Sequence, residues 1–227
     1  MDYAVKLRNV TKRFKETTAV EGVTVSFEIG KIYGIIGRNG SGKTVLFKCI
    51  CGLLAVTEGE ITVLEQPVGD GIHVPKGVGA IIENPGFLPN ASGYRNLYYL
   101  AALSGKPDRQ KIRDTIALVG LDPDSKKHVG NYSLGMRQRL GLAQAIMEDP
   151  ELLILDEPMN GLDNQGVQDM RILLKELRAK GKTIILASHS QEDIAQIDVL
   201  KDGSSAAIYS CSMYCWKSFA LSIAFFP

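Results

Sequence analysis

The sequence predicts an α/β fold with a mostly parallel sheet at its core, preceded by an antiparallel β subdomain and interrupted by a helical insertion. Four short, largely apolar runs lie at residues 32–36, 78–82, 152–155 and 183–187. Runs of this length are typical of parallel strands that are buried on both faces. Segments with helical periodicity lie between them, and this alternation favours an α/β architecture.

The N-terminal segment has a different pattern. Val23, Val25 and Phe27 alternate with polar residues, which is the period-2 pattern of a half-exposed antiparallel strand. We therefore expect the segment from Ala4 to Glu28 to form the antiparallel β subdomain.

Helices are predicted where apolar residues recur at positions i, i+3, i+4 and i+7. The clearest case is the set Met170, Leu173, Leu174 and Leu177. Similar spacing at 94–101 and 112–119 places two helices within residues 89–147, which we expect to form a helical subdomain. A further helix is expected at 191–197.

The composition is that of an ordinary globular protein. The chain has 227 residues, of which 45% are hydrophobic and 22% are charged, which excludes a disordered or fibrous protein. Lys plus Arg number 26 and Asp plus Glu 25, so no nucleic-acid partner is expected. No secretory signal is expected at the start. Cys49 and Cys51 lie in an apolar stretch and are predicted to be core residues in a reducing compartment.

A glycine-rich segment follows the first apolar run and fits the pattern G-x-x-x-x-G-K-[ST]. Its residues are Gly37, Arg38, Asn39, Gly40, Ser41, Gly42, Lys43 and Thr44. Such a loop directs backbone N–H groups at phosphates, while the lysine adds a positive charge and the hydroxyl a Mg²⁺ ligand. The alternative is a chance glycine-rich turn, but a strand before it and a helix at 43–50 are the context that this motif requires. The segment therefore predicts ATP and Mg²⁺ as ligands.

Two adjacent acids follow the third apolar run. Asp156 and Glu157 come directly after residues 152–155, and parallel strands deliver such residues to the edge of the sheet where ligands bind. Asp156 is a candidate for holding Mg²⁺, and Glu157 for polarising a water that attacks the γ-phosphate. A turn at the end of the strand is the alternative for this pair taken alone.

Three more segments carry a family resemblance. Residues 132–139, Tyr-Ser-Leu-Gly-Met-Arg-Gln-Arg, resemble the signature of ABC-transporter ATPases, usually Leu-Ser-Gly-Gly-Gln. Residues 160–163, Asn-Gly-Leu-Asp, match the D-loop of that family, and His189 matches its switch histidine. With the glycine-rich segment and the two acids, the resemblance covers roughly residues 3 to 200, and the chain is identified as a member of this family.

The resemblance implies roles for several residues. In the family, two ATPase subunits pair head to tail with ATP between them, so Ser133 and Gly135 would contact the nucleotide of the partner and Asp163 would reach across the interface. His189 would contact the γ-phosphate beside Glu157, and Phe14 would stack on adenine. Taken alone, His189 also fits a structural role, and Phe14 fits a core or hairpin aromatic.

At two places the sequence departs from the usual pattern of the family, and these departures indicate a subfamily. Glu83 stands where the family usually has a Gln that senses Mg²⁺, and a carboxylate can also bind this cation. The signature lacks one of the usual glycines, where this chain has Leu134, and the usual Gln, where it has Met136. These features resemble the ATPases of bacitracin-resistance and lantibiotic-immunity exporters of bacteria. The resemblance implies a multi-span membrane permease as a separate partner, a second ATPase subunit, and a location at the cytoplasmic face of the membrane.

Two other functions stay open: a soluble ABC ATPase that does not serve transport, and a nucleotide-binding module with impaired hydrolysis. No membrane span is predicted before Ala206, so the substrate path is expected in another polypeptide. We expect residues 1–205 to form the ATPase domain and 206–227 an atypical tail with one charged residue, Lys217. This tail fits a poorly structured or frameshifted end, a pair of strands that closes the sheet, or a membrane-contacting segment.

Overall fold

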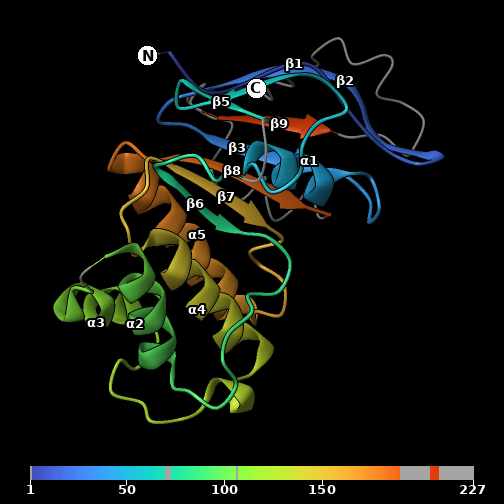
Figure 1. Cartoon of the computed structure of the whole chain (residues 1–227). Coiled ribbons are helices and arrows are strands. Elements are labelled where there is room, and N and C mark those ends of the chain that lie inside the picture. The colour runs from blue at the N-terminus through green and yellow to red at the C-terminus, as the bar shows by residue number, and fades with distance from the viewer. Residues whose placement is uncertain (1, 70–72, 106, 190–204, 210–227) are drawn as a thin grey trace.

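The residues that the structure describes form two sheets and five α-helices. The computed structural model describes residues 2–69, 73–105, 107–189 and 205–209. An antiparallel sheet and one helix, α1 (Lys43–Ile50), cover one face of a parallel sheet, and the longer helices cover the other face (Figure 1). This arrangement confirms the α/β fold class with an antiparallel N-terminal part.

The parallel sheet contains the four strands that the apolar runs predict. Its order is β6-β7-β8-β3-β9, and every neighbouring pair is parallel. The strands span β3 (Ile32–Ile36), β6 (Val78–Ile81), β7 (Leu152–Asp156), β8 (Thr183–Ser188) and β9 (Ser205–Tyr209). The carboxyl ends of β3, β7 and β8 therefore lie side by side at one edge of the sheet.

Strand β9 extends the sheet into the segment that the sequence assigns to the tail. It pairs in parallel with β3, with Ile32 opposite Ser205 and Ile36 opposite Tyr209. Strand β9 therefore spans the boundary that the sequence predicts between residues 205 and 206. The helix expected at 191–197 and residues 210–227, including Lys217, lie outside the described residues.

The antiparallel sheet has the order β2-β1-β4-β5. Its strands are β1 (Tyr3–Phe14), β2 (Thr17–Glu28), β4 (Glu58–Val63) and β5 (Gln66–Val68). In β2, Val23, Val25 and Phe27 are buried and the residues between them are exposed, which confirms the alternation. Strands β4 and β5 are not predicted by the sequence pattern, because the first three residues of β4 are all exposed and its alternation begins only at Ile61.

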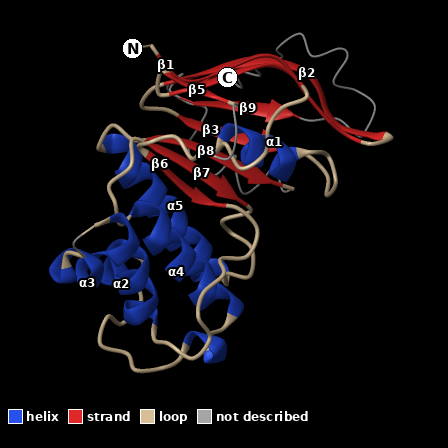
Figure 2. Ribbon diagram, viewed as in Figure 1, coloured by secondary structure: helices blue, strands red, loops and turns tan. Residues whose placement is uncertain are grey.

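The remaining helices confirm the predicted periodicity. They are α2 (Gly93–Ser104), α3 (Arg109–Leu118), α4 (Leu134–Ile146) and α5 (Asn164–Ala179), with a 3-10 helix at Val129–Asn131. Helices α2, α3 and α4 fall within the segment 89–147. Figure 2 shows the helices gathered on one side of the parallel sheet, with the antiparallel strands on the other side.

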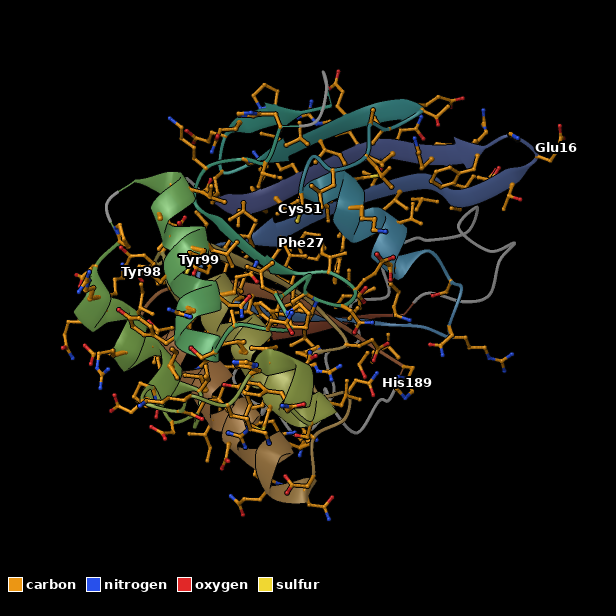
Figure 3. The ribbon with its side chains drawn as sticks, turned by 60° about the horizontal axis from the view of Figure 1, so that its bottom comes forward. Glu16, Phe27, Cys51, Tyr98, Tyr99 and His189 are labelled. Atoms are coloured by element: carbon orange, nitrogen blue, oxygen red, sulfur yellow. The ribbon has the colours of Figure 1, made fainter. Side chains whose placement is uncertain are left out.

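The parallel sheet is buried on both faces, which explains why its strands are apolar throughout. In β7, Leu152 and Ile154 pack toward α1 and the antiparallel sheet, whereas Leu153 and Leu155 pack toward the long helices. Phe27 and Cys51 lie in the first of these two layers (Figure 3). Cys49 and Cys51 are each 1% exposed, so both are core residues as predicted.

Candidate nucleotide site

The turn from β3 into α1 forms a cradle of backbone at the edge of the parallel sheet. Gly42 has a φ of 89° and is the residue directly before the helix. A Cβ at this position would overlap the carbonyl oxygen of Ala19 on β2. Glycine is therefore required here both for the backbone conformation and for the close approach of the hairpin.

The N-terminus of α1 differs from those of the other α-helices. Side chains of Ser92, Asp108, Ser133 and Asp163 cap helices α2, α3, α4 and α5. Within the described part of the chain, no side chain caps α1. Its first N–H groups can therefore bind an anion, and the positive end of the helix dipole favours one.

Lys43 lies in this cradle with its ammonium group at the centre. Its side chain is 5% exposed and donates hydrogen bonds to the carbonyl oxygens of Gly37 at 2.6 Å and Arg38 at 3.2 Å. The Nζ atom also lies 3.8 Å from Oε1 of Glu157. The loop thus holds a buried positive charge close to a carboxylate from the neighbouring part of the sheet.

Asp156 ends β7 beside the start of α1. The hydroxyl of Thr44 donates a hydrogen bond of 2.6 Å to its Oδ2. Burial raises the pKa of the Asp156 carboxyl, the Thr44 hydrogen bond opposes this rise, and the neighbouring charge of Glu157 adds to it. The other carboxylate oxygen, Oδ1, is buried and has no hydrogen-bond partner among the described residues.

Glu157 is held by its backbone in a left-handed conformation. Its φ is 50°, and its N–H donates a hydrogen bond to the Ala187 carbonyl at 3.1 Å. The side-chain amide Nε2 of Gln138 donates a hydrogen bond to the backbone carbonyl of Glu157 at 3.3 Å. The Oε2 atom lies 2.9 Å from Nδ1 of His189. Gln138 lies inside the signature segment, but the sequence alone predicts no role for it.

These groups surround one pocket of about 350 Å³. Residues 39–45 line it together with Ala19, Asp156 and Glu157. The structure thus brings together the predicted cradle and the two predicted acids, which lie more than a hundred residues apart in the sequence. A volume of this size, lined by a lysine, backbone N–H groups and two carboxylates, can accept a polyphosphate and its counterion.

The donor set fits a Mg²⁺ ion. Thr44 and Asp156 provide a hydroxyl and a buried carboxylate oxygen that has no protein hydrogen-bond partner in the described residues. Mg²⁺ usually takes only one or two protein ligands and completes its shell with water and phosphate oxygens. Accordingly, the described residues contain no group of three or more His, Cys, Asp or Glu side chains that could hold a metal by themselves.

Glu83 occupies a different position from the other candidate metal ligands. Its carboxylate accepts a hydrogen bond of 2.7 Å from Lys48 of α1, and its side chain is 61% exposed. Its negative charge contributes to the raised pKa of Asp156. The role of Glu83 toward Mg²⁺ stays a prediction.

Phe14 is exposed at the end of β1. The ring is 43% exposed, and the ammonium group of Lys12 lies 5.0 Å from its centre. The adjoining turn extends away from the body of the molecule, as the label of Glu16 in Figure 3 shows. From this hairpin it is Ala19, and not Phe14, that lines the pocket; adenine stacking on Phe14 stays a prediction.

Ser133, Gly135 and Asp163 lie away from the pocket of their own chain, at the starts of α4 and α5. The Ser133 hydroxyl accepts from the Met136 N–H at 3.2 Å, and an Asp163 carboxylate oxygen accepts from the Gly166 N–H at 2.8 Å. Ser133 and Asp163 are exposed. A second molecule can therefore reach both of them.

Residues 20–160 match the family model described as "ABC transporter". The chain belongs to the ABC transporter family. This result confirms the resemblance that the signature, D-loop and switch histidine indicated.

Relatives of known name are similar over most of this chain. It is 43% identical over 199 residues to the bacitracin transport ATP-binding protein BcrA of Enterococcus faecalis, covering 87% of this chain and 65% of the relative. It is 35% identical over 193 residues to the lantibiotic transport ATP-binding protein SrtF of Streptococcus pyogenes, covering 85% and 83%. The chain thus spans about two thirds of the first relative's length, and the similarity agrees with the narrower resemblance.

Solved structures of the same fold include a dimeric ABC transporter cassette, MJ0796. The TM-score is 0.78 at 22% sequence identity, and the match covers 91% of this chain and 94% of the cassette. A structure of MJ0796 described as a post-hydrolysis state bound to ADP and Pi matches with a TM-score of 0.79. These matches confirm the ABC ATPase fold.

Proposed function

We propose that this chain is the ATP-binding and ATP-hydrolysing subunit of a bacterial ABC exporter of peptide antibiotics or lantibiotics. The observation that carries the proposal is the convergence of Lys43, Asp156 and Glu157 on one pocket at the uncapped N-terminus of α1. This arrangement provides positive charge for a triphosphate and carboxylates for its metal and its attacking water.

Binding begins at the cradle. The N–H groups of the turn and of the first turn of α1 donate hydrogen bonds to the phosphate oxygens, and Lys43 exchanges its hydrogen bonds to the loop carbonyls for hydrogen bonds to the β- and γ-phosphates. Thr44 and Asp156 would hold Mg²⁺, which when bound neutralises phosphate charge and orients the triphosphate. This ion would also satisfy Oδ1 of Asp156, which has no hydrogen-bond partner among the described residues.

Hydrolysis requires a water aligned with the γ-phosphorus. Glu157 accepts a proton from this water as its oxygen attacks, and the bond from the γ-phosphorus to the bridging oxygen of ADP breaks. His189 holds the Glu157 side chain through the 2.9 Å contact, and Gln138 holds its backbone. Fixed placement of a general base beside the water is the contribution of this chain to the rate.

Two copies, or this chain and a related one, pair around ATP. Ser133 and Gly135 of each subunit contact the γ-phosphate bound by the other, and Asp163 reaches across the interface. The exposure of Ser133 and Asp163 supports this role. ATP then stabilises the closed pair, and hydrolysis with phosphate release opens it.

A separate permease completes the transporter at the cytoplasmic face of the membrane. Within the described ranges, no helix is long and apolar enough to cross a bilayer. Residues 83–103 form the docking surface in this proposal. Exposed apolar side chains in that segment, namely Leu88, Tyr99 and Leu103 at 53%, 46% and 85%, support it. Crosslinks from this segment to the permease in a functional complex would be expected; their absence would contradict this part.

One substitution tests the core of the proposal. Glu157→Gln keeps the size of the side chain and removes the base, so purified protein with Mg-ATP should bind ATP, form a dimer and lose turnover by about 100-fold or more. Lys43→Ala serves as the comparison, because it should weaken ATP binding itself. A Glu157→Gln protein that hydrolyses like the parent would refute the assignment of the base, and unchanged ATP affinity in Lys43→Ala would refute the cradle.

The same measurements separate the two alternative functions. A module with impaired hydrolysis would bind ATP without turnover in the parent protein. A soluble ATPase without a transport role would hydrolyse ATP. On co-expression it would not associate with a multi-span membrane protein encoded by a neighbouring reading frame.

A further inference from the structure

The signature segment and the D-loop are in contact within one chain. Leu134, the first residue of α4, is 50% exposed and stands where the family usually has glycine. Gly161 of the D-loop has a φ of 74°, and a Cβ added to it would overlap Cγ and Cδ2 of Leu134 and lie 3.1 Å from its Cβ. The Leu134 side chain therefore occupies space that exists because residue 161 has no side chain.

The next residues of the two segments are also a glycine and a leucine, but here the glycine belongs to the signature segment and the leucine to the D-loop. Gly135 follows Leu134, and a Cβ added to it would lie 3.0 Å from the carbonyl oxygen of Gly161 and 3.3 Å from Cδ2 of Leu162. Here the signature segment has no side chain and the D-loop supplies one. A large residue thus faces a glycine in both directions.

This contact lies between two groups that the proposed function places at the subunit interface. Ser133 immediately precedes Leu134 and caps α4, and Asp163 immediately follows Leu162 and caps α5. Farther along the same two helices, Arg139 of α4 donates a hydrogen bond of 2.9 Å to Asp169 of α5. The two helix starts are therefore joined by steric contact, and the helices by an ion pair beyond it.

We propose that Leu134 and Gly161 form a size-matched pair that holds the signature segment and the D-loop in one fixed relation. The inference rests on the proposed function and deepens it. Both segments would meet the same second copy, and close packing transmits a displacement of one to the other. Segments that are already fixed lose less conformational freedom when two subunits close, so Leu134 and Gly161 act as positioning residues.

The test is a size exchange in the full chain, in the Glu157→Gln background that retains ATP. Gly161→Ala adds the clashing methyl group, and Leu134→Gly in the same chain removes the side chain that it meets. Gly181→Ala is the matched control: its φ is 86°, and no described atom lies within 4 Å of an added Cβ. It therefore carries the same backbone strain without a clash.

The readouts are the ATP-dependent dimer dissociation constant, by light scattering, and the ATP affinity of the monomer. Relative to Gly181→Ala, Gly161→Ala should weaken dimerisation by about tenfold or more, a coupling expected for residues in contact, with unchanged monomer affinity for ATP. Adding Leu134→Gly should restore most of the loss. Equal effects of the two glycine substitutions, or no restoration, would overturn the proposal.

Two further outcomes also test the proposed pair of Leu134 and Gly161. If Gly161→Ala does not fold while Gly181→Ala does, folding of the double variant supports the pair and its failure overturns it. If Glu157→Gln does not dimerise with ATP at all, the proposed pairing of subunits fails. The contact between Leu134 and Gly161 is then tested by the midpoints of thermal unfolding. A midpoint about 2–4 °C higher in the double variant than in Gly161→Ala, which corresponds to the coupling of one contact, supports the proposal. Losses that add in the double variant overturn the proposal.

Discussion

At the scale of single residues, the two acids of the pocket share one feature of their carboxylate groups. Asp156 has a buried carboxylate oxygen with no hydrogen-bond partner among the described residues, and Glu157 has another. Such groups cost free energy unless an ion or water satisfies them. A metal ion or a water bound at these carboxylates would therefore stabilise the fold.

The raised pKa of Asp156 predicts a pH-dependent effect on stability. Burial raises the pKa of the Asp156 carboxyl in the folded state above the ordinary value of 3.8. As pH rises, the carboxyl therefore loses its proton at a lower pH in the unfolded chain than in the folded chain. The ionised carboxylate thus destabilises the fold at neutral pH. In protein free of nucleotide and Mg²⁺, Asp156→Asn should therefore raise the free energy of unfolding at pH 7. This gain should shrink as pH falls toward 4 in urea titrations.

Asp169 provides a control of opposite sign. Hydrogen bonds from Gln165 and Arg139 lower the pKa of its carboxyl, so its ionised form stabilises the fold at neutral pH and Asp169→Asn should lower stability there. If Asp156→Asn also lowers stability at pH 7, the account of the buried carboxylate is wrong.

A substitution at Gly42 should lower the free energy of unfolding by a steric clash in addition to backbone strain. Alanine at a positive φ costs about 1 kcal/mol, and this is the expected cost of Gly30→Ala, where φ is 75° and no described atom lies within 4 Å of an added Cβ. Gly42→Ala should cost about 1–3 kcal/mol more, because the methyl group meets the backbone of Ala19. Chemical denaturation of the two variants checks the difference, and equal losses would contradict it.

At the scale of elements, the helix starts divide into capped and uncapped ones. Side chains cap α2, α3, α4 and α5, whereas α1 leaves its N–H groups for a ligand. The cap of α4 differs from the others in standing inside the signature segment. We therefore expect Ser133 to have a structural role and a second role that appears only with ATP.

A comparison of two serine caps separates these roles. Ser133→Ala and Ser92→Ala each remove one side-chain cap and should each lower the free energy of unfolding by about 1 kcal/mol. Only Ser133→Ala should also weaken ATP-dependent dimerisation in the Glu157→Gln background, because its hydroxyl is expected to contact the nucleotide of the partner. Equal dimerisation of both variants would rule out the second role.

At the scale of the whole molecule, one core joins the helical segment to the parallel sheet. Leu97 of α2 is 0% exposed and belongs to the same buried cluster as Leu153 and Leu155 of β7. Strand β7 presents its alternate residues to the cluster on the other face. The helical segment is therefore not an independent unit in terms of its packing.

This continuity predicts cooperative unfolding. Leu97→Ala should lower the free energy of unfolding by about 2–5 kcal/mol, as expected for a large buried side chain. The loss should appear in a single transition that far-UV circular dichroism and tyrosine fluorescence report at the same urea concentration. A separate, earlier transition that appears in one of these two signals and not in the other would contradict the shared core.

The local elements and the chemistry of the cradle could be predicted from the sequence. Apolar runs, helical spacing and the motif from Gly37 to Thr44 depend on neighbours in the chain, so a single sequence is sufficient to read them. The four predicted strands of the parallel sheet, the helices at 94–101, 112–119 and 170–177, and α1 are all confirmed. The residues alone left His189 open between two roles, and only the family resemblance placed it beside Glu157.

The contacts that complete the site required the tertiary structure. Gln138 reaches the carbonyl of Glu157, Lys48 holds Glu83, and Leu134 fills the space above Gly161, and each pair is widely separated in sequence. Strand order decides which carboxyl ends become neighbours, and β9 shows that the sheet continues past the predicted boundary. The sequence by itself determined which groups this protein has for phosphate and metal; packing decided their partners, because distances between remote segments follow from how the layers fit together.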